Sequence, residues 1–170
     1  DGRETAVALP TGAKISNPQW SPDGKYIAFG NIAAAGVELW LVDTATAKAR
    51  RLGKDYVNTA FGGYGWEGST HISVTLVPAG RGPAPQYRDL VPTGPNIQET
   101  TGRRGAVATV QDLLKSPNDE KLYDYYATSQ LALVSLDGKV KNVGQPAIFD
   151  QNVFSPDGKY VLVSRIVRPY

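Results

Sequence analysis

The chain has 170 residues, 41% hydrophobic and 20% charged, a composition typical of one folded domain and too apolar for a disordered segment. It has no cysteine and one histidine, His71, which excludes disulfides, thiolate metal sites and polyhistidine sites, and we predict no metal and no cofactor. The net charge of +2 is too balanced to indicate a nucleic-acid surface, and no run of residues approaches the roughly 20 apolar residues of a membrane span.

A segment near the start of the chain, residues 17–29, recurs near its end as residues 151–163. Both copies contain Ser-Pro-Asp-Gly-Lys-Tyr, preceded by Trp20 in the first and Phe154 in the second. Proline presets the first central position of a type I turn, and glycine accepts a positive φ. Since the residues after each turn are strand formers with little polar interruption, each copy predicts strand, tight turn and strand, with the second strand buried on both faces.

The residues after the first copy continue this antiparallel pattern. A strand is predicted at 37–43, a turn at 44–47 and a short polar strand, suited to an outer edge, at 48–52. A weaker copy of the repeat follows at 61–77, with Trp66 in the place of Trp20. The two tryptophans are 46 residues apart, close to the roughly 40–45 residues of a four-stranded propeller blade.

The distance from Trp66 to Phe154 is 88 residues, about 40 more than one blade, and predicts an insertion. Glycine and proline interrupt the strands at 78–85, and residues 86–108 show little periodicity. Residues 109–114 look helical, and Ser116-Pro117-Asn118-Asp119 predicts the start of a helix that runs to 126, with Leu122, Tyr125 and Tyr126 on one side. Strands return at 130–136 and 139–143, around an Asp137-Gly138 hairpin turn.

The predicted fold is all-β: a partial β-propeller of two to three antiparallel blades with a small helical insertion. Residues 1–53 form the first blade, 54–145 the second with its insertion at about 79–129, and 146–170 the start of a third. Closed propellers have about four to eight blades. We therefore expect the chain, which lacks methionine, to be a processed or excised piece, with further blades beyond Tyr170 or with self-association of copies through open blade edges.

The repeated unit resembles that of TolB-like propellers, which occur in Tol-system periplasmic proteins and in prolyl oligopeptidase family serine peptidases. Five further segments resemble the N-terminal region of the glutamyl endopeptidase branch of that family: 77–85, 92–99, 125–134, 155–160 and 168–170. The resemblance covers nearly the whole chain, insertion included. It implies a larger exported parent, periplasmic in bacteria, whose C-terminal α/β-hydrolase domain carries the catalytic Ser, Asp and His.

This resemblance predicts a non-catalytic segment that gates or positions peptide substrate for the C-terminal peptidase domain, its expected partner. The nucleophile elbow Gly-x-Ser-x-Gly is absent from the 170 residues, so we predict no catalytic residue among them. Two alternatives are a periplasmic protein-interaction scaffold of the TolB type and a carbohydrate-binding fragment. A long reading frame with Gly-x-Ser-x-Gly after Tyr170 favours the peptidase, and a stop codon after a few more blades favours the scaffold.

Three arginines are candidate substrate-binding residues, because each lies between or beside glycines on flexible backbone: Arg81, Arg103 and Arg104. Guanidinium groups bind carboxylates in a bidentate manner, which suits recognition of an acidic peptide. The competing interpretation is solvated loop charge, which is common for surface arginines and which the sequence favours.

Three other groups of residues admit a functional interpretation, and a structural one is favoured for each. Ser69 and His71 share a strand face as a nucleophile–base pair would, but no elbow presents the serine. Each Asp-Gly turn offers a single carboxylate, which suits turn hydrogen bonds better than calcium, at Asp23 and Asp157. Aromatic residues at helical spacing usually pack rather than form a stacking platform, which applies to Tyr123, Tyr125 and Tyr126.

Overall fold

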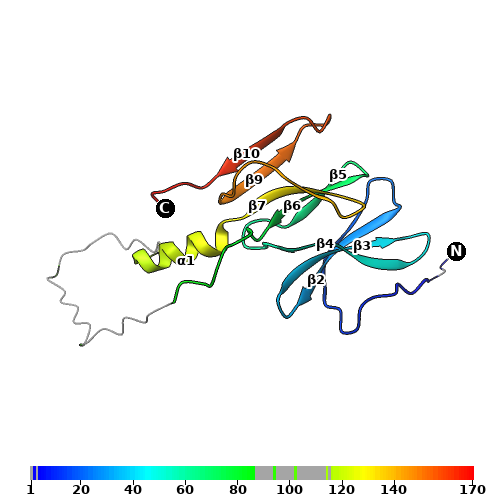
Figure 1. Cartoon of the computed structure of the whole chain (residues 1–170), viewed down its shortest axis with the longest axis horizontal. Helices are drawn as coiled ribbons and strands as arrows, with labels where there is room; N and C mark the ends of the chain where they lie inside the picture. Colours follow the sequence, from blue (N-terminus) through cyan, green and yellow to red (C-terminus); the bar gives the residue numbers. More distant parts are fainter. Residues whose placement is uncertain (1, 3, 87–93, 95–101, 103–113, 115) are drawn as a thin grey trace.

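A computed structural model describes residues 2, 4–86, 94, 102, 114 and 116–170. Two four-stranded antiparallel meanders and a hairpin follow one another along the chain (Figure 1). The first consists of β1 (Ile15–Trp20), β2 (Tyr26–Ala33), β3 (Gly36–Asp43) and β4 (Lys48–Val57). The second consists of β5 (Tyr64–Glu67), β6 (His71–Leu76), β7 (Gln130–Ser135) and β8 (Val140–Asn142), and the hairpin of β9 (Phe149–Phe154) and β10 (Val161–Arg165).

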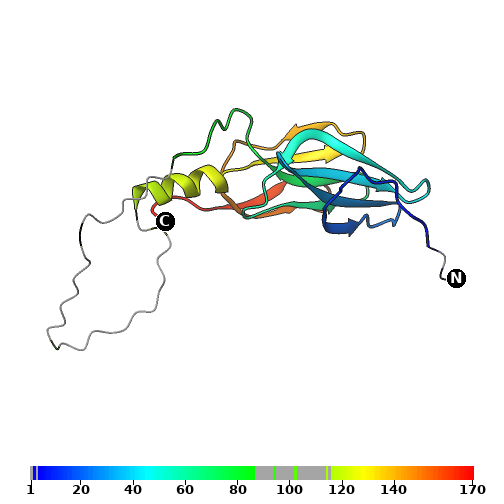
Figure 2. The same cartoon turned by 90° about the horizontal axis from the view of Figure 1, so that it is seen from below.

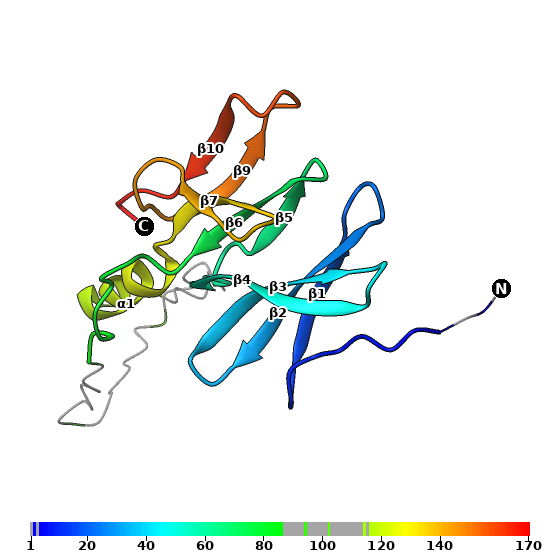
Figure 3. The ribbon, with the colours of Figure 1, turned by 45° about the vertical axis from the view of Figure 1, so that its right-hand side comes forward.

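The three units fan out side by side as successive blades, with their strands in the order in which they occur along the chain (Figure 3). The first two are joined in one hydrogen-bonded sheet by a single residue pair, Val57 with Leu76. The twin segments identified in the sequence lie in separate sheets, around the β1–β2 and β9–β10 turns. The predicted partial propeller is thus confirmed.

The core lies between the first two blades. Apolar side chains of β2, β3 and β4 meet those of β6 and β7 in one buried cluster: Ala28, Leu39, Leu41, Leu52, Val57, Ile72, Val74, Leu76, Ala132 and Val134. Polar side chains add bonds across the same boundary. The Trp66 indole N–H donates to the carbonyl of Gln19 at 3.1 Å, and the Gln19 amide donates to the carbonyl of Tyr64 at 3.1 Å. Trp66, the aromatic residue before the turn of the second blade, therefore lies where the first two blades join.

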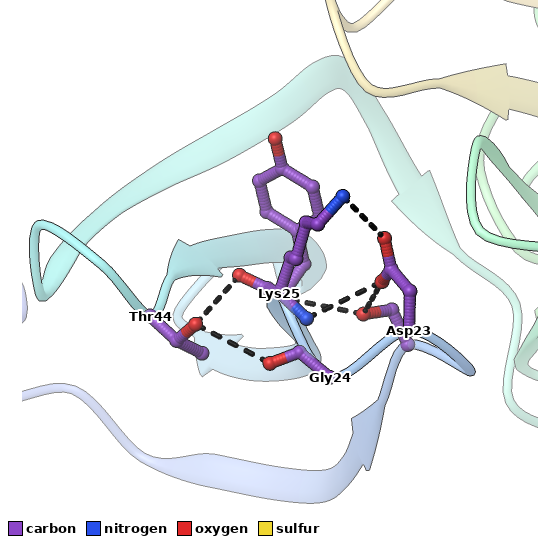
Figure 4. Close-up of polar contacts among 6 residues, drawn as sticks. Asp23, Gly24, Lys25 and Thr44 are labelled. Carbon is purple, nitrogen blue, oxygen red and sulfur yellow. Dashed lines mark hydrogen bonds and ion pairs between the residues drawn. The ribbon is translucent and has the colours of Figure 1, made fainter.

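The duplicated turn is held by its aspartate, as expected from the sequence, and also by its serine, for which the sequence predicted no role. The Ser21 hydroxyl donates to the Asp23 carboxylate at 2.7 Å and accepts the N–H of Tyr26 at 2.9 Å. Ser155 makes the same two bonds at 2.6 and 3.0 Å, and the glycines of the two turns have φ of 70° and 68°. Figure 4 shows the first turn, on which the Thr44 hydroxyl of the β3–β4 connection also donates to the carbonyls of Gly24 and Lys25.

We expect Ser21→Ala to destabilise the β1–β2 hairpin by about 1–2 kcal/mol, because Ser21 is buried and its loss leaves the Tyr26 N–H without a partner. Hydrogen exchange of the β1–β2 amides in the whole protein measures this. Ser155→Ala is the matched control: that turn is solvent-exposed, so water replaces the lost hydroxyl and the change should be about 0.5 kcal/mol. Equal effects at the two serines would contradict this account.

Two strand predictions need correction. The strand after the second turn was expected to be buried on both faces, yet Tyr160 is 74% exposed and Leu162 76% exposed. The reason is that, among the residues that the structure describes, β10 pairs with β9 alone and no further strand lies beside it, whereas Ala28 and Phe29 of β2 lie between β1 and β3 and are buried. The strand expected at 48–52 is longer, since β4 continues to Val57 and meets the second blade there.

The helical prediction for the insertion is confirmed where the structure describes it. Helix α1 (Pro117–Ala127) begins with the expected capping box, in which the Ser116 hydroxyl accepts the N–H of Asp119 and the Asp119 carboxylate accepts the N–H of Ser116. The helix expected at 109–114 lies outside the described residues except for Leu114, which is not helical.

Candidate functional site

Helix α1 and the loop after β6 form a site at the end of the sheets opposite the duplicated turns (Figure 3). Both belong to the connection between β6 and β7 of the second blade. A surface depression of about 440 Å³ lies between them, lined among others by Pro78, Arg81, Pro85, Lys121, Asp124 and Tyr125. The depression contains one of the three arginines singled out in the sequence.

Arg81 is placed by the backbone on either side of it. Gly80 and Gly82 have φ of 76° and 72°, in the left-handed region that glycine adopts without strain. The Arg81 guanidinium lies 4.1 Å from the centre of the Tyr125 ring and 5.4 Å from that of Tyr126. The Tyr125 hydroxyl donates to the carbonyl of Gly82 at 2.8 Å, so the loop and the helix hold each other in place. A cation lying over aromatic faces in this way is attracted by the ring quadrupole.

The C-terminal end of α1 is anchored to the body of the propeller by Asn58. Its side-chain amide donates to the carbonyls of Tyr126 and Thr128, each at 2.9 Å, and its side-chain oxygen accepts the N–H of Ala60. Asn58 is 6% exposed, so these bonds are shielded from water. Tyr123 packs edge-on against Phe61, which lies in the same connection between β4 and β5 as Asn58. The helix is thereby fixed to the first two blades.

The charges at the depression are unevenly balanced. No carboxylate lies within ion-pair distance of Arg81 among residues 4–86 and 116–170. Asp124, the acid beside it, is bound by Arg168 at 2.5 Å and by the Tyr170 hydroxyl. Burial raises the pKa of Asp124, but these two hydrogen bonds and the Arg168 charge outweigh burial, so the pKa lies below its ordinary value. Arg81 and Lys121 are left to attract an anionic group.

The sequence identified some of these residues and missed others. Arg81 lies at the depression, while Arg103 and Arg104 fall outside the described residues. Packing was expected for the tyrosines and holds for Tyr123, which contacts Phe61 and Tyr170. The rings of Tyr125 and Tyr126 instead meet edge-on, and the Arg81 guanidinium lies over both. The Tyr126 side chain is 51% exposed. No sequence motif marked Lys121 or Asn58 as part of the site. Helical spacing could have placed Lys121 beside Tyr125, because the two residues are one turn apart on the helix.

The structural interpretations of the other candidate groups agree with the contacts. A ring nitrogen of His71 pairs with the Thr70 hydroxyl at 3.0 Å rather than with Ser69, at the rim of a groove of about 660 Å³ between the second and third blades. Asp23 and Asp157 accept the N–H groups of Lys25 and Lys159 and pair with the same lysines' side chains. Hydrogen bonding within the turns thus accounts for both aspartates.

The described residues contain no helix long and apolar enough to cross a membrane. They also contain no cluster of three or more His, Cys, Asp or Glu residues that could hold a metal ion.

Comparison with known proteins gives three informative matches, although no family model matches the chain. A probable chloroplastic glutamyl endopeptidase of Oryza sativa subsp. japonica is 40% identical over 99% of this chain and 19% of its own length. The Tol-Pal system protein TolB of Chromobacterium violaceum is 36% identical over 29% of this chain and 12% of its own length. A solved prolyl endopeptidase structure superposes on 89% of this chain and 18% of its own, with a TM-score of 0.50 at 16% identity.

These matches confirm the resemblance seen in the sequence. The structural match shows the propeller fold, and the rice match extends through the insertion that distinguishes this chain from a plain repeat. The chain spans about a fifth of the length of this glutamyl endopeptidase, and its sequence is similar to the N-terminal propeller region of such peptidases.

Proposed function

We propose that this chain is a non-catalytic propeller segment of a larger serine peptidase of the glutamyl endopeptidase kind, in which it gates or positions peptide substrate. The observation that carries the proposal is the 40% identity with a glutamyl endopeptidase along 99% of the chain, combined with a fold built of propeller blades. The match with a TolB protein covers 29% of the chain, so an interaction scaffold is the weaker alternative.

The proposed gating depends on the width of the propeller channel, and the proposed positioning depends on the charge of Arg81. A ring of blades leaves a narrow channel or a cleft against a neighbouring domain, which admits short flexible peptides and excludes folded proteins. At the end of the sheets where α1 lies, Arg81 presents a guanidinium held on Tyr125 with no carboxylate partner among the described residues. We propose Arg81 as a carboxylate-binding residue for acidic peptides, with Arg103 and Arg104 as further candidates in the same insertion.

The proposal includes the expected partners, the self-association, the division into blades and the cellular location. The partners are a C-terminal peptidase domain and a peptide, and the isolated piece is expected to self-associate through the open edge of β10. The division into blades is proposed as expected from the sequence, at about 1–53, 54–145 and 146–170, with β4 continuing to Val57. An exported location is proposed for a bacterial parent, whereas the rice relative is named as chloroplastic.

The test of Arg81 is a kinetic comparison in the full-length protein that contains this segment. Arg81→Gln is expected to raise KM for a glutamate-containing peptide by about tenfold, at the low end of what a hydrogen bond to a charged group contributes, because Arg81 is partly exposed. kcat should change little, since the residue binds substrate equally in the ground and transition states. A peptide with glutamine in place of glutamate is the substrate control and should be insensitive to the substitution.

Arg165→Gln is the matched control variant, because Arg165 is exposed on β10 and has no ion pair among the described residues. An unchanged KM for the glutamate peptide in Arg81→Gln would remove Arg81 from substrate binding. Cleavage of a folded protein as fast as of its unfolded chain would argue against gating.

A further inference from the structure

Two residues near the end of the chain, Arg168 and Tyr170, contact helix α1, although they follow β10 of the third blade and α1 belongs to the second blade. The Arg168 guanidinium pairs with two carboxylates of the helix, Glu120 and Asp124, the latter at 2.5 Å. Figure 2 shows this C-terminal stretch running beside the helix. The contact joins positions 44 and 48 residues apart in the sequence, so it cannot arise from local chain geometry.

The two carboxylates suit one guanidinium because of their spacing. Glu120 and Asp124 are four residues apart on α1 and so lie on the same face of the helix, one turn apart. The two terminal nitrogens of Arg168 reach one carboxylate each. The hydrogen bond with Asp124, followed by the charges of Asp124 and Glu120, raises the pKa of Arg168. Lysine has a single ammonium in place of this fork and is a poorer fit to both acids.

Aromatic packing reinforces the ion pairs. The Tyr170 hydroxyl donates to the second oxygen of Asp124, and the Tyr170 ring lies 4.7 Å from that of Tyr123 in an edge-on arrangement. Tyr123 in turn contacts Phe61 of the β4–β5 connection. The segment is also tied to its own blade, where the N–H of Ile166 donates to the carbonyl of Ile148. A continuous set of contacts therefore runs from the third blade through α1 to the connection between the first two.

From these contacts we infer that Arg168 is a positioning residue. Its ion pairs with Glu120 and Asp124, called the clasp below, hold α1 against the third blade and thereby fix the Tyr125 ring on which Arg81 lies. Glu120 and Asp124, which pair with Arg168, lie on one face of α1. Tyr125, on which the Arg81 guanidinium lies, is on the neighbouring face of the same helix. Without the Arg168 ion pairs, α1 keeps its hydrogen bonds to Asn58 and its contact with Phe61, but its N-terminal part loses its tether to the third blade. The clasp itself rests on the geometry alone, and its effect on substrate rests on the proposed function.

The experiment uses the full-length protein and two readouts. Hydrogen exchange of residues 117–127 reports the helix itself, and Arg168→Gln is expected to speed it about three- to tenfold, because two ion pairs and the order of Tyr170 are lost together. KM for a glutamate peptide is expected to rise about threefold with kcat unchanged, as the Arg81 platform loosens. Arg168→Lys should recover part of each effect, and Arg165→Gln should show neither.

The outcomes separate the clasp from the proposed function. Unchanged exchange of α1 in Arg168→Gln would overturn the inference. Faster exchange with an unchanged KM overturns the positioning role if Arg81→Gln does raise KM. If Arg81→Gln also leaves KM unchanged, the clasp stands and the proposed substrate site fails. A glutamine peptide that responds to Arg168→Gln as strongly as the glutamate peptide would also refute positioning through Arg81.

Discussion

Replacing Glu38 by alanine is expected to lower the free energy of unfolding of the first blade by about 2–3 kcal/mol, because a partly buried carboxylate and the hydrogen bonds to it are lost together. The Glu38 carboxylate, 14% exposed, accepts the indole N–H of Trp40 at 2.8 Å and the amide of Asn31 at 3.1 Å, and pairs with Arg51 at 2.8 Å. These partners come from β2, β3 and β4. Because the Arg51 Nε is already buried without a partner, loss of Glu38 leaves a poorly compensated cation.

The effect has a defined pH dependence. The hydrogen bond from Trp40 is the largest influence on the pKa of Glu38, and with those from Asn31 and the charge of Arg51 it outweighs burial and places the pKa below its ordinary value. A carboxyl group whose folded pKa is depressed stabilises the fold above its unfolded pKa, about 4.3, and loses that contribution as the pH falls through the folded value. The difference between wild type and Glu38→Ala should therefore shrink as the pH falls below about 5.

Hydrogen exchange of the β2, β3 and β4 amides in the whole protein gives the measurement at each pH. Glu38→Gln should cost about half as much, since its amide oxygen still accepts from Trp40 while the charge opposite Arg51 is lost. Glu67→Gln is the control, because no hydrogen bond or ion pair of the Glu67 side chain is found among the described residues. A destabilisation by Glu38→Ala that stays constant down to low pH would show that packing, not charge, is responsible.

The fold was predictable from the sequence where local chemistry determines it. The Ser-Pro-Asp-Gly turn, the Asp137-Gly138 hairpin and the cap at Ser116 each specify their own backbone through nearby side chains, and all three occur as expected. The spacing between Trp20 and Trp66 then predicted the blade repeat, and Trp66 bonds to the first blade at Gln19, next to Trp20 in the sequence.

The candidate site was only partly predictable, because its contacts join distant parts of the chain. Glycines on both sides marked Arg81, but nothing local indicated that its guanidinium lies on Tyr125, 44 residues later. The pairing of Arg168 with helix α1 depends on how the third blade packs. The burial of Tyr160 and Leu162 was mispredicted for a related reason. Apolar composition shows that a strand is able to bury its side chains, but the elements that pack against the strand determine which side chains are buried.

The core between the first two blades predicts a second large effect. Ile72→Ala in β6 is expected to cost about 3–4 kcal/mol, since the side chain is 0% exposed and its removal leaves a cavity. Ile72 shares one buried cluster with Leu39 and Leu41 of β3, so the cavity opens toward the other blade as well. Exchange of β3 amides should therefore accelerate together with that of β6 and β7, whereas Ile32→Ala, at a side chain 50% exposed, should change neither.

Acceleration confined to β6 and β7 would mean that each blade is stable by itself and that the contact between the two blades adds little stability. A shared loss would mean that the first two blades are stable only when packed together, because their apolar side chains share one buried cluster.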